Sequence, residues 1–494
     1  MNADIALIYN ENCTYPLKKN AFRPSVDYPE NPFPENISQD FNVSYDSVRK
    51  AFQYLDLDTK NFGTDKWNPL GEYVKPGDCV AIKPNLVMHK NYRRGFATDT
   101  DCVYTHPSVT AAVIDYVIVA LKGEGKIIVG DAPVQECDFD VLVEQSGYAD
   151  LIRFYKEKGI AIELKDFRGL KSVSHYGVLH QRINVDAEYT IVHLDAYSEF
   201  TNSGSVNSEN IRITNYNPAE LLSHHCQSMH EYCVASDILN ADVVINIPKP
   251  KTHKKAGITG ALKNLVGINC RKEYLPHHTV GDASMQGDEY NRKSFFKAMR
   301  SRLHDFFCNA VSQKKYLAAR CYQIFVLTLD GIIRHIFRDK TSWGSWYGNN
   351  TISKTIIDLN KILLFADKKG IIRVRPQRRM FTVADMIISG EHNGPMAPTS
   401  KNAGLIIAAE DPLGVDEVIA KIMGADADKI PTLVQARCSS NPLRIISCKR
   451  TDIRLVSNDL RWHNKKINEI CDDGILYFKS PDDWETVFYR KDNV

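Results

Sequence analysis

The sequence predicts an α/β fold: a Rossmann-like, mainly parallel sheet with an inserted helical region. Two observations support it. Short apolar runs recur along the chain, and each stops at a polar or charged cluster. Segments with helical spacing separate several of these runs, which is typical of βαβ units. With 494 residues, 43% of them apolar and 25% charged, the chain is long enough for a large globular domain with additions.

Five apolar runs are predicted as buried strands: Val80–Ile82, Ile127–Val129, Ile160–Leu164, Val243–Ile247 and Leu405–Ala408. The polar clusters that follow them are Lys83-Pro84-Asn85, Gly130-Asp131, Lys165-Asp166, Pro248-Lys249 and Glu410-Asp411. Open α/β sheets bind ligands beyond the carboxyl ends of their parallel strands. We therefore expect the functional site at these clusters.

The predicted helices have start and stop signals. After Thr105-His106-Pro107, apolar residues recur every fourth position until Gly123. A threonine near the cap, a proline in the first turn and a trailing glycine mark a helix. The segment from Val415 to Gly424 has the same pattern, and Lys293–Phe337 is mainly helical and amphipathic.

These patterns divide the chain into five parts. Residues 1–75 form an N-terminal arm and a first helical segment, and Thr14–Gln39 within them is expected to be an extended arm or loop. Residues 76–290 and 351–440 form the two parts of the α/β domain. Residues 291–350 are a helical insertion, and residues 441–494 are a C-terminal extension.

The most informative stretch is Asp242–Gly267, DVVINIPKPKTHKKAGITGALKNLVG. A buried strand leads into a lysine-rich loop, and a helix start is expected at Gly257–Gly260. Free N–H groups and the positive dipole end of a helix attract anions, and lysines add point charges. The predicted anion-binding residues are Lys83, Lys249, Lys251, Thr259, Gly260, Lys263 and Asn264. The alternative is a solvated basic loop followed by an ordinary helix.

Several common site signatures are absent from the sequence. The stretch lacks the GxxxxGK[ST] spacing of a P-loop, and no GxGxxG dinucleotide motif occurs. There is no GxSxG for a serine nucleophile and no HExxH for a metalloprotease. The reaction class therefore stays open.

Acidic residues supply candidates for catalysis and for a metal ion. Asp131 follows a predicted strand, and Glu391 lies in the turn-forming segment Gly390–Pro395; both are candidate catalytic residues. Asp385 and Asp411 are candidate ligands for Mg²⁺, which prefers oxygen ligands. Helix capping or simple surface exposure explains each carboxylate equally well.

Histidines supply candidates for proton transfer. His106, His253 and His278 are candidates, and the lysine neighbours of His253 favour it as the catalytic one. The cluster His224-His225-Cys226 with His230 and Cys233 fits no established zinc spacing, and a loop or helix surface explains it as well. Trp343, Trp346 and Tyr347 are candidates for a stacking lid over a ligand, with core or interface packing as the favoured alternative.

Charge and cysteine usage limit the partners and the compartment. A formal net charge of +2 argues against a dedicated nucleic-acid binder. Met1–Glu11 lacks the features of a secretory signal, and twelve scattered cysteines favour a reducing cytoplasm. The apolar stretch Tyr316–Phe337 is interrupted by charges, so we expect a buried helix, with contact to a membrane surface as the alternative.

The motifs occur in a familiar order. VAIKPNL at Val80–Leu86, Thr105-His106-Pro107, Gly130–Pro133, Lys249–Gly267 and Gly390–Pro395 follow one another. Over roughly Cys79–Gln435 the chain resembles the uncharacterised bacterial and archaeal family catalogued as domain of unknown function 362. The segment Gly344–Asn349 matches a longer branch of that family, often found with surface-polysaccharide genes. This resemblance implies a role in making an anionic sugar or envelope component.

Some members of that family carry ferredoxin-like iron–sulfur modules. This sequence has no CxxC and no clustered cysteines, so we expect no built-in iron–sulfur cluster. The resemblance supplies no established activity.

Three functional hypotheses follow from the sequence. The first is an enzyme that binds a phosphorylated or carboxylated small molecule, with Mg²⁺ as a candidate cofactor. The second is a non-catalytic binding or scaffold protein of an envelope-biosynthesis complex, docked through Lys293–Phe337. The third is a redox protein with an external cofactor. The sequence favours an enzyme and does not indicate the oligomeric state.

Overall fold

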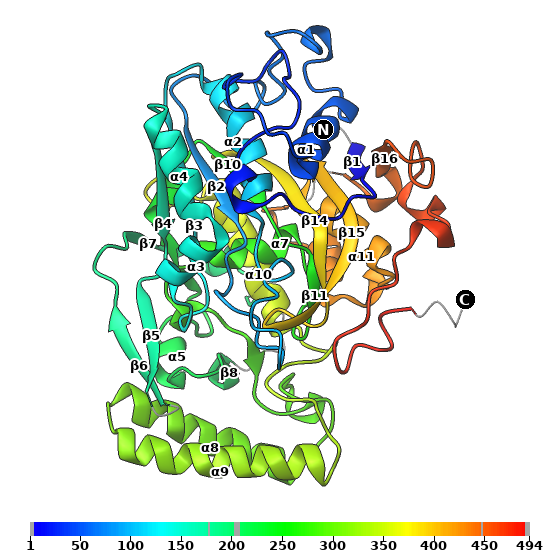
Figure 1. Cartoon of the computed structure of the whole chain (residues 1–494). Coiled ribbons are helices and arrows are strands. Elements are labelled where there is room, and N and C mark those ends of the chain that lie inside the picture. Colours follow the sequence, from blue (N-terminus) through cyan, green and yellow to red (C-terminus); the bar gives the residue numbers. More distant parts are fainter. Residues whose placement is uncertain (1–3, 176–177, 202–207, 446–447, 490–494) are drawn as a thin grey trace.

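The computed structural model describes residues 4–175, 178–201, 208–445 and 448–489, and is built around one large sheet (Figure 1). In these residues the sheet has ten strands, and its main path runs β16-β1-β15-β14-β10-β2-β3-β4. The strands on this path are β1 (Asp4–Tyr9), β2 (Cys79–Pro84), β3 (Lys126–Asp131), β4 (Ile162–Asp166), β10 (Val243–Ile247), β14 (Arg379–Asn393), β15 (Ala397–Ala409) and β16 (Arg454–Ser457). The short strands β11 (Lys251–His253) and β12 (Gly257–Thr259) pair beside this path.

Five neighbouring strands form the parallel part of the sheet. Within the group β14-β10-β2-β3-β4, each strand is parallel to the adjacent member. Numbered in chain order, the parallel strands lie in the order third, second, first, fourth, fifth, which is the order of a doubly wound Rossmann-like sheet. The predicted fold class is confirmed. The strand order reverses between β2 and β10, where such folds open a crevice at the carboxyl edge.

One predicted strand runs in the other direction. Leu405–Ala408 lies in β15, and β15 pairs antiparallel with both β14 and β1. The long β14–β15 hairpin connects these two strands without a crossover helix. Glu410 and Asp411 therefore follow β15 toward the amino edge of the parallel strands, away from the other polar clusters.

Helices cover both faces of the sheet. One face carries α1 (Val43–Tyr54), α2 (Pro107–Leu121), α3 (Phe139–Ser146) and α4 (Tyr148–Glu157). The other carries α7 (Ala261–Asn264), α10 (Thr351–Phe365), α11 (Pro412–Met423) and α12 (Pro431–Cys438). Side chains alternate between the two cores: Val243 and Ile245 of β10 face the first and Val244 the second.

The helix signals in the sequence work as expected. α2 has Pro107 in its first turn, and the His106 side chain accepts the N–H of Ser108 as its N-cap. Lys122, in the left-handed region, ends α2 just before Gly123. Gly424 ends α11 with a positive φ, the conformation that favours glycine at this position.

Smaller elements pack around this frame. The additional strands are β5 (Leu170–His175), β6 (Val178–Ile183), β7 (Tyr189–His193), β8 (Ile211–Arg212), β9 (Glu231–Ala235) and β13 (His278–Thr279). Two short helices, α5 (Pro218–Leu222) and α6 (Ser236–Asn240), lie among them.

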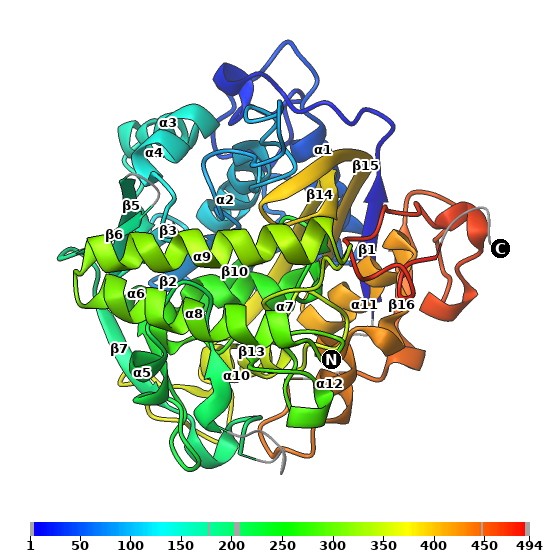
Figure 2. The same cartoon turned by 90° about the horizontal axis from the view of Figure 1, so that it is seen from below.

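The predicted helical insertion is a hairpin of two long helices, α8 (Phe295–Ser312) and α9 (Tyr316–His335). The hairpin forms a separate layer at the bottom of the molecule (Figure 1), and the view from below shows it crossing in front of the domain (Figure 2). Within the described residues, one helix, α9, is apolar and long enough to cross a membrane by composition alone. Its best window has a mean hydropathy of 1.3, and 22% of that window is buried.

Described segments near both termini are part of the domain. β1, near the N-terminus, lies between β15 and β16, so the C-terminal extension supplies an edge strand. The predicted arm is closely packed at its start, because Tyr15 is 8% exposed and reaches the core. Trp484 of the C-terminal extension is fully buried and donates its indole N–H to the carbonyl oxygen of Lys254, at 2.7 Å.

Candidate anion-binding site

Six lysines come together at the carboxyl edge of the parallel strands, at the reversal between β2 and β10. We call them the lysine site: Lys83, Lys249, Lys251, Lys255, Lys263 and Lys272. Lys83 ends β2, Lys249 and Lys251 follow β10, Lys255 lies in the β11–β12 turn, and Lys263 lies in α7. The ends of strands that are distant in sequence therefore bring these lysine side chains together at one edge of the sheet.

Lys83 and Asp131 form a buried ion pair between the ends of β2 and β3. The Nζ of Lys83 is 2.8 Å from Oδ1 of Asp131, and Oδ2 accepts the N–H of Leu86 at 2.6 Å. Gly267 lies directly against this pair, since a Cβ there would be 1.9 Å from Oδ1 of Asp131. The two residues predicted for anion binding and catalysis are thus partners of one another.

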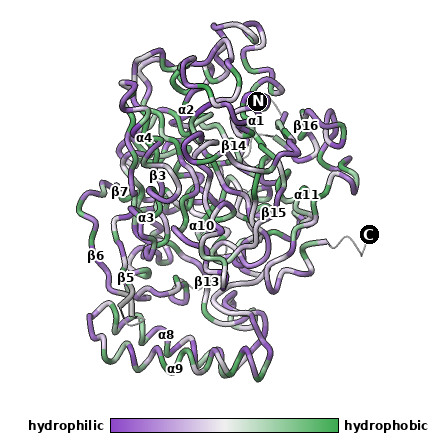
Figure 3. Tube along the Cα trace, viewed as in Figure 1, coloured by the Kyte–Doolittle hydropathy of each residue, from purple (hydrophilic) through white to green (hydrophobic). Residues whose placement is uncertain are grey.

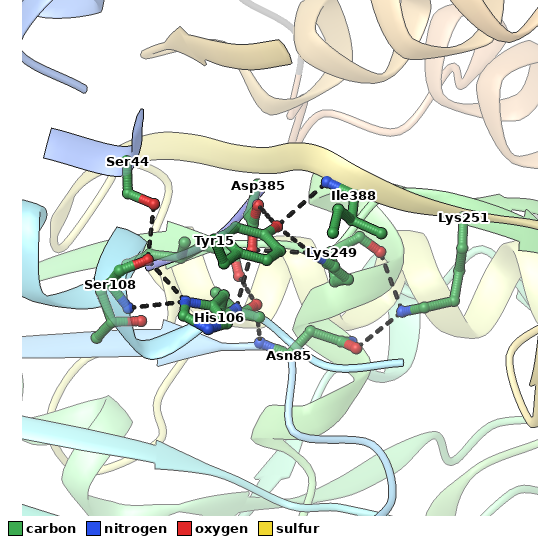
Figure 4. A network of polar contacts seen from close by, with 12 residues as sticks. Tyr15, Ser44, Asn85, His106, Ser108, Lys249, Lys251, Asp385 and Ile388 are labelled. Atoms are coloured by element: carbon green, nitrogen blue, oxygen red, sulfur yellow. Dashed lines mark hydrogen bonds and ion pairs between the residues drawn. The ribbon is translucent and has the colours of Figure 1, made fainter. Parts of the chain in front are cut away.

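Lys249 and Asp385 form a second, fully buried pair (Figure 4). Lys249 Nζ is 3.0 Å from Oδ2 of Asp385 and donates to the Tyr15 hydroxyl at 2.6 Å. The Tyr15 hydroxyl in turn donates to Asp385, and the N–H of His106 donates to Oδ2 of the same carboxylate at 2.9 Å. The Tyr15 ring stacks on His106 with centroids 4.0 Å apart. Lys249 is therefore an internal cation, compensated within the protein.

The side-chain amide of Asn264 is hydrogen-bonded to several residues of the site. Its Oδ1 accepts from Asn85 Nδ2 at 2.9 Å, and its Nδ2 donates to the carbonyl of Lys83 and to Asn246. Asn85 Oδ1 accepts from Lys251 Nζ at 3.0 Å. Because both ends of the Asn264 amide are occupied, this residue positions Lys83 and Lys251 and is not free to hold an anion.

The remaining four lysines have no carboxylate partner among the described residues. Lys251 donates to Asn85 and to the carbonyl of Lys249, Lys255 to Thr214, and Lys272 to the carbonyl of Ala132 at 3.1 Å. In the described part of the chain, Lys263 has neither an ion pair nor a hydrogen bond from its ammonium group. The site therefore carries positive charge that the protein does not neutralise.

Burial is the largest cause of a lowered pKa in all four side chains. Desolvation, followed by repulsion from neighbouring lysines, lowers the pKa of Lys251 and of Lys263 to about 7. Desolvation lowers the pKa of Lys255 and Lys272 to about 8. Lys255, Lys263 and Lys272 are partly exposed, whereas Lys251 is fully buried. An anion reaching these three would relieve the repulsion.

Two histidines at the site differ in the ring nitrogen they leave available. His253 Nδ1 accepts the N–H groups of Lys255 and Ala256 at 3.0 and 3.1 Å, so its Nε2 carries the proton. His277 Nδ1 is 2.7 Å from the carbonyl oxygen of Leu275 and must donate to it, which leaves Nε2 as an acceptor. Burial and the nearby lysines lower the pKa of both, so both are neutral. This geometry favours His277, rather than the predicted His253, as a proton acceptor.

The helix start predicted at Gly257–Gly260 has a different structure. Gly257–Thr259 is strand β12, and α7 is only four residues long. Its first N–H groups, those of Ala261 and Leu262, donate to the carboxylate of Asp416 in α11. A Cβ at Gly260 would lie 2.0 Å from Oδ1 of Asp416, so Gly260 makes room for this carboxylate. The helix N-terminus is therefore already occupied.

The predicted anion-binding residue Thr259 differs from Gly260 in having an unsatisfied polar group. Its side chain is 4% exposed, and its hydroxyl has no hydrogen-bond partner among the described residues. Thr259 pairs with Lys251 across the β11–β12 hairpin. Buried hydroxyls rarely go without a partner, so an additional oxygen beside Lys251 would satisfy this one.

The structure does not bring Glu391 into contact with Asp131. Glu391 accepts the N–H of Lys479 at 3.0 Å and lies 3.5 Å from its ammonium group, so it ties the C-terminal extension to β14.

Asp385 and Asp411, the predicted magnesium ligands, also lie apart. Asp385 is bonded to Lys249, Tyr15 and His106, whereas Asp411 caps α11 through the N–H of Leu413. The antiparallel direction of β15 separates them. Among residues 4–175, 178–201, 208–445 and 448–489, no group of three or more His, Cys, Asp or Glu side chains could hold a metal ion. The magnesium site stays a prediction without a ligand set.

The other histidine cluster is packed into the protein. His225 and His230 are buried with Nδ1 atoms 3.3 Å apart, and burial lowers their pKa to about 3 and about 4. Trp343 packs against His304 and lies under the guanidinium of Arg300, at 4.1 Å. Their contacts therefore explain His225, His230 and Trp343 as packed residues of the fold.

A surface hollow of about 350 Å³ lies elsewhere, beside α1 and β16, and is lined in part by Asp56, Arg454 and His463. It shares no residue with the lysine site. The lysine site is the candidate functional site, because it places at the strand reversal lysines that have no carboxylate partner in the described part of the chain, whereas the lining of this hollow includes both acidic and basic side chains.

Five residues of the site were not among those predicted to act there: Tyr15, Asn85, Lys255, Lys272 and His277. Lys255 lies in the lysine-rich loop after β10. Asn85 belongs to the polar cluster after β2, so position at a strand end could have indicated it. Tyr15, Lys272 and His277 have no local pattern, since tertiary packing alone brings them to the site.

A comparison with family models gives the family. The model described as a domain of unknown function, DUF362, matches residues 80–192 and 185–421, which is most of the chain. The chain belongs to this family. The matched region contains all six lysines, Asp131 and Asp385, whereas Tyr15 and the C-terminal extension lie outside it.

A curated relative is the thylakoid-associated protein of Synechocystis sp. It is 28% identical over 198 residues, which cover 40% of this chain. The aligned part spans 41% of the length of that relative. No solved structure matches the chain.

Proposed function

We propose that the chain is an enzyme that binds a multiply charged anionic small molecule, phosphorylated or carboxylated, at the lysine site. The observation that carries this proposal is the group of four lysines without carboxylate partners at the reversal of strand order. A protein that desolvates several like charges loses stability unless an opposite charge joins them. A bound dianion would supply that charge.

The contacts suggest different roles for the exposed lysines, the buried ion pairs and His277. Lys255, Lys263 and Lys272 are partly exposed and would contact the anion, with Lys251 and the Thr259 hydroxyl behind them. The ion pairs Lys83–Asp131 and Lys249–Asp385 would hold the surrounding strand ends. His277 Nε2 is a neutral acceptor near these lysines, suited to take a proton from a bound substrate.

Location and pathway are further parts of the proposal. All twelve cysteines are free, which supports a reducing compartment such as the cytoplasm. The name of the Synechocystis relative supports an association with a membrane. A role in surface-polysaccharide or envelope synthesis rests on the resemblance to the longer branch of the family.

Native mass spectrometry of protein purified from its host tests the proposal. We expect a retained anionic molecule on the wild type and its loss from the Lys251→Ala/Lys263→Ala variant. Lys369→Ala, which changes an exposed lysine elsewhere, is the matched control. Equal retention by the double variant and the wild type would remove the anion-site assignment.

Turnover separates the enzyme from the scaffold alternative. A retained molecule that is converted on addition of a co-substrate supports the enzyme, and a molecule that is bound but never converted supports the binding protein. A flavin or iron band in the absorbance spectrum would favour the redox alternative.

A further inference from the structure

Helix α9 has apolar residues on two opposite sides, and only one side is covered. Ala319, Val326, Leu329 and Ile333 are buried and repeat at helical spacing. This side packs against α8. On the outward side, Leu317 is 88% exposed and Phe325 60% exposed, with Ile324 between them in sequence and also exposed. Hydrophobic residues accordingly recur along the tube of α9 in Figure 3.

The outward side lies at the boundary of the molecule. Seen from below, α8 and α9 lie side by side in front of the rest of the molecule (Figure 2). Ile336 and Phe337 add two exposed apolar side chains just beyond the end of the helix, at 69% and 54% exposure. Isolated exposed apolar residues are common, but several of them on one helix indicate an interaction site.

The hairpin is strongly basic. Residues 291–338 contain ten Lys and Arg residues and two Asp residues. Both acids are engaged: Asp305 pairs with Arg212 at 3.3 Å and Asp330 with Arg300 at 3.0 Å. Because the whole chain has a formal charge of +2, the hairpin at +8 leaves −6 on the rest. The positive charge is concentrated on the layer that carries the exposed apolar residues.

The basic residues surround the apolar stripe. Lys314 and Lys315 precede α9, Arg320 lies in its second turn, and Arg334 and Arg338 lie at its end; all five are exposed. Apolar residues flanked by lysine and arginine are the composition of helices that lie in the interface of an anionic bilayer.

The hairpin is firmly attached to the domain. Arg300 of α8 makes a fully buried ion pair with Glu289, at 3.1 Å, and Asp305 of α8 pairs with Arg212 of β8 at 3.3 Å. α9 is therefore a preformed surface held in one orientation. Crossing a bilayer is disfavoured, because one side of α9 packs on α8 and Asp330 would have to enter hydrocarbon.

We propose that the outward side of α9 docks on an anionic lipid bilayer, with the helix lying in the plane of the headgroups. Leu317, Ile324 and Phe325 enter the interface, and the flanking lysines and arginines contact anionic headgroups. The remaining, negatively charged part of the molecule is repelled and faces away. This inference is independent of the lysine site.

Vesicle flotation with the full chain tests this proposal. We expect binding to vesicles of phosphatidylcholine mixed with phosphatidylglycerol, weakening with added salt, and little binding to phosphatidylcholine alone. The Leu317→Ser/Ile324→Ser/Phe325→Ser variant should bind about tenfold or more weakly, because three apolar side chains no longer enter the interface. The Arg320→Gln/Arg334→Gln variant should lose the preference for phosphatidylglycerol.

The control changes three apolar residues that are equally exposed elsewhere: Ile371→Ser/Val374→Ser/Leu460→Ser. This variant should bind as the wild type does, and equal thermal melting of all variants shows that they fold. Absence of wild-type binding, or equal binding by the α9 variant, overturns the proposal. A wild type that ignores vesicles but self-associates through α9 would show that a second copy covers the helix, and also overturns it.

Discussion

Lys263 shows the energetics of the site at the scale of one residue. Its ammonium group lies among Lys272, Lys83 and Lys255, and Asp131 offsets them in part. Water reaches the side chain only partly, so desolvation remains the largest cause of its low pKa. A strongly lowered pKa of this kind is typical of functional sites, and we propose that Lys263 binds an anion.

Replacing Lys263 by methionine should stabilise the ligand-free protein. The lysine has a pKa of about 7 in the folded state and an ordinary, higher pKa when unfolded, so its cost to folding is complete below pH 7 and fades as the pH rises. We expect a gain of about 1 kcal/mol, or roughly 1–3 °C in Tm, at pH 6 and a smaller gain at pH 9. Thermal melting measures it. A variant that melts lower than the wild type at pH 6 would contradict this.

The affinity for an anion should depend on pH with the same sign. Sulfate keeps its charge between pH 6 and 9, so any change reports on the protein. Lys251 and Lys263 are protonated below pH 7, and binding must recharge them above it. We expect calorimetry to show about tenfold weaker sulfate binding at pH 9 than at pH 6. An affinity independent of pH would show that other groups hold the anion.

Tyr15 links the N-terminal arm to the core through a single hydroxyl. Tyr15→Phe leaves the stacking on His106 intact and removes one partner each from Lys249 and Asp385. Because both charges are fully buried, we expect a loss of about 1–3 kcal/mol in urea denaturation. Tyr189→Phe, at a more exposed ring, is the control. Equal stability of both variants would show that the Tyr15 hydroxyl is dispensable.

At the scale of elements, α7 illustrates how packing replaces a ligand. A four-residue helix has little stability of its own, and Asp416 of α11 occupies its first two N–H groups. Burial raises the pKa of Asp416 to about 7. The carboxylate of Asp416 therefore occupies the N-terminus that the sequence predicts as an anion site, and Lys263 of the same helix has no carboxylate partner among the described residues.

Asp416→Ala should therefore loosen α7. Two buried N–H groups lose their acceptor, and we expect a loss of about 1–3 kcal/mol in the free energy of unfolding. Urea denaturation measures it, with Glu157→Ala at an exposed helix position as the control. Faster amide exchange at Ala261 and Leu262 would locate the effect, and unchanged exchange there would contradict it.

The elements that the sequence predicts well are those whose signals are local. α2 and α11 have capping residues at the start and a glycine after the end, and β10 is an uninterrupted run that is mostly apolar. Their bounds can therefore be predicted from neighbouring residues. The direction of β15 is not local. The apolar run of β15 looks the same in sequence as the run of a parallel strand. Its antiparallel direction results from the long hairpin that β15 forms with β14.

At the scale of the whole molecule, residues of the site that lie at strand ends can be predicted from the sequence, whereas residues brought in by distant segments cannot. Strand ends place Lys83, Asp131, Lys249 and Lys251 at one edge, because parallel strands bring their carboxyl ends together. Sequence reasoning could not show that Lys83 and Lys249 are already paired, because their partners come from distant segments. It could not find Tyr15, Lys272 or His277, which the arm and the loops after α7 deliver.

The molecule separates two kinds of positive charge. The lysine site holds buried charge at the strand reversal, suited to one small anion. The hairpin holds exposed charge around apolar residues, suited to an extended anionic surface. Since the rest of the chain is negative, both stand out from their surroundings.

Calorimetric titration of inorganic pyrophosphate at pH 7 tests the central claim most directly. The wild type and Lys369→Met, the matched change at an exposed lysine, should bind it at one site. Lys263→Met should bind it at least about tenfold more weakly while remaining folded. Binding by Lys263→Met that equals the wild type, or no binding of pyrophosphate, sulfate or inorganic phosphate by the wild type, would contradict an anion site at these lysines.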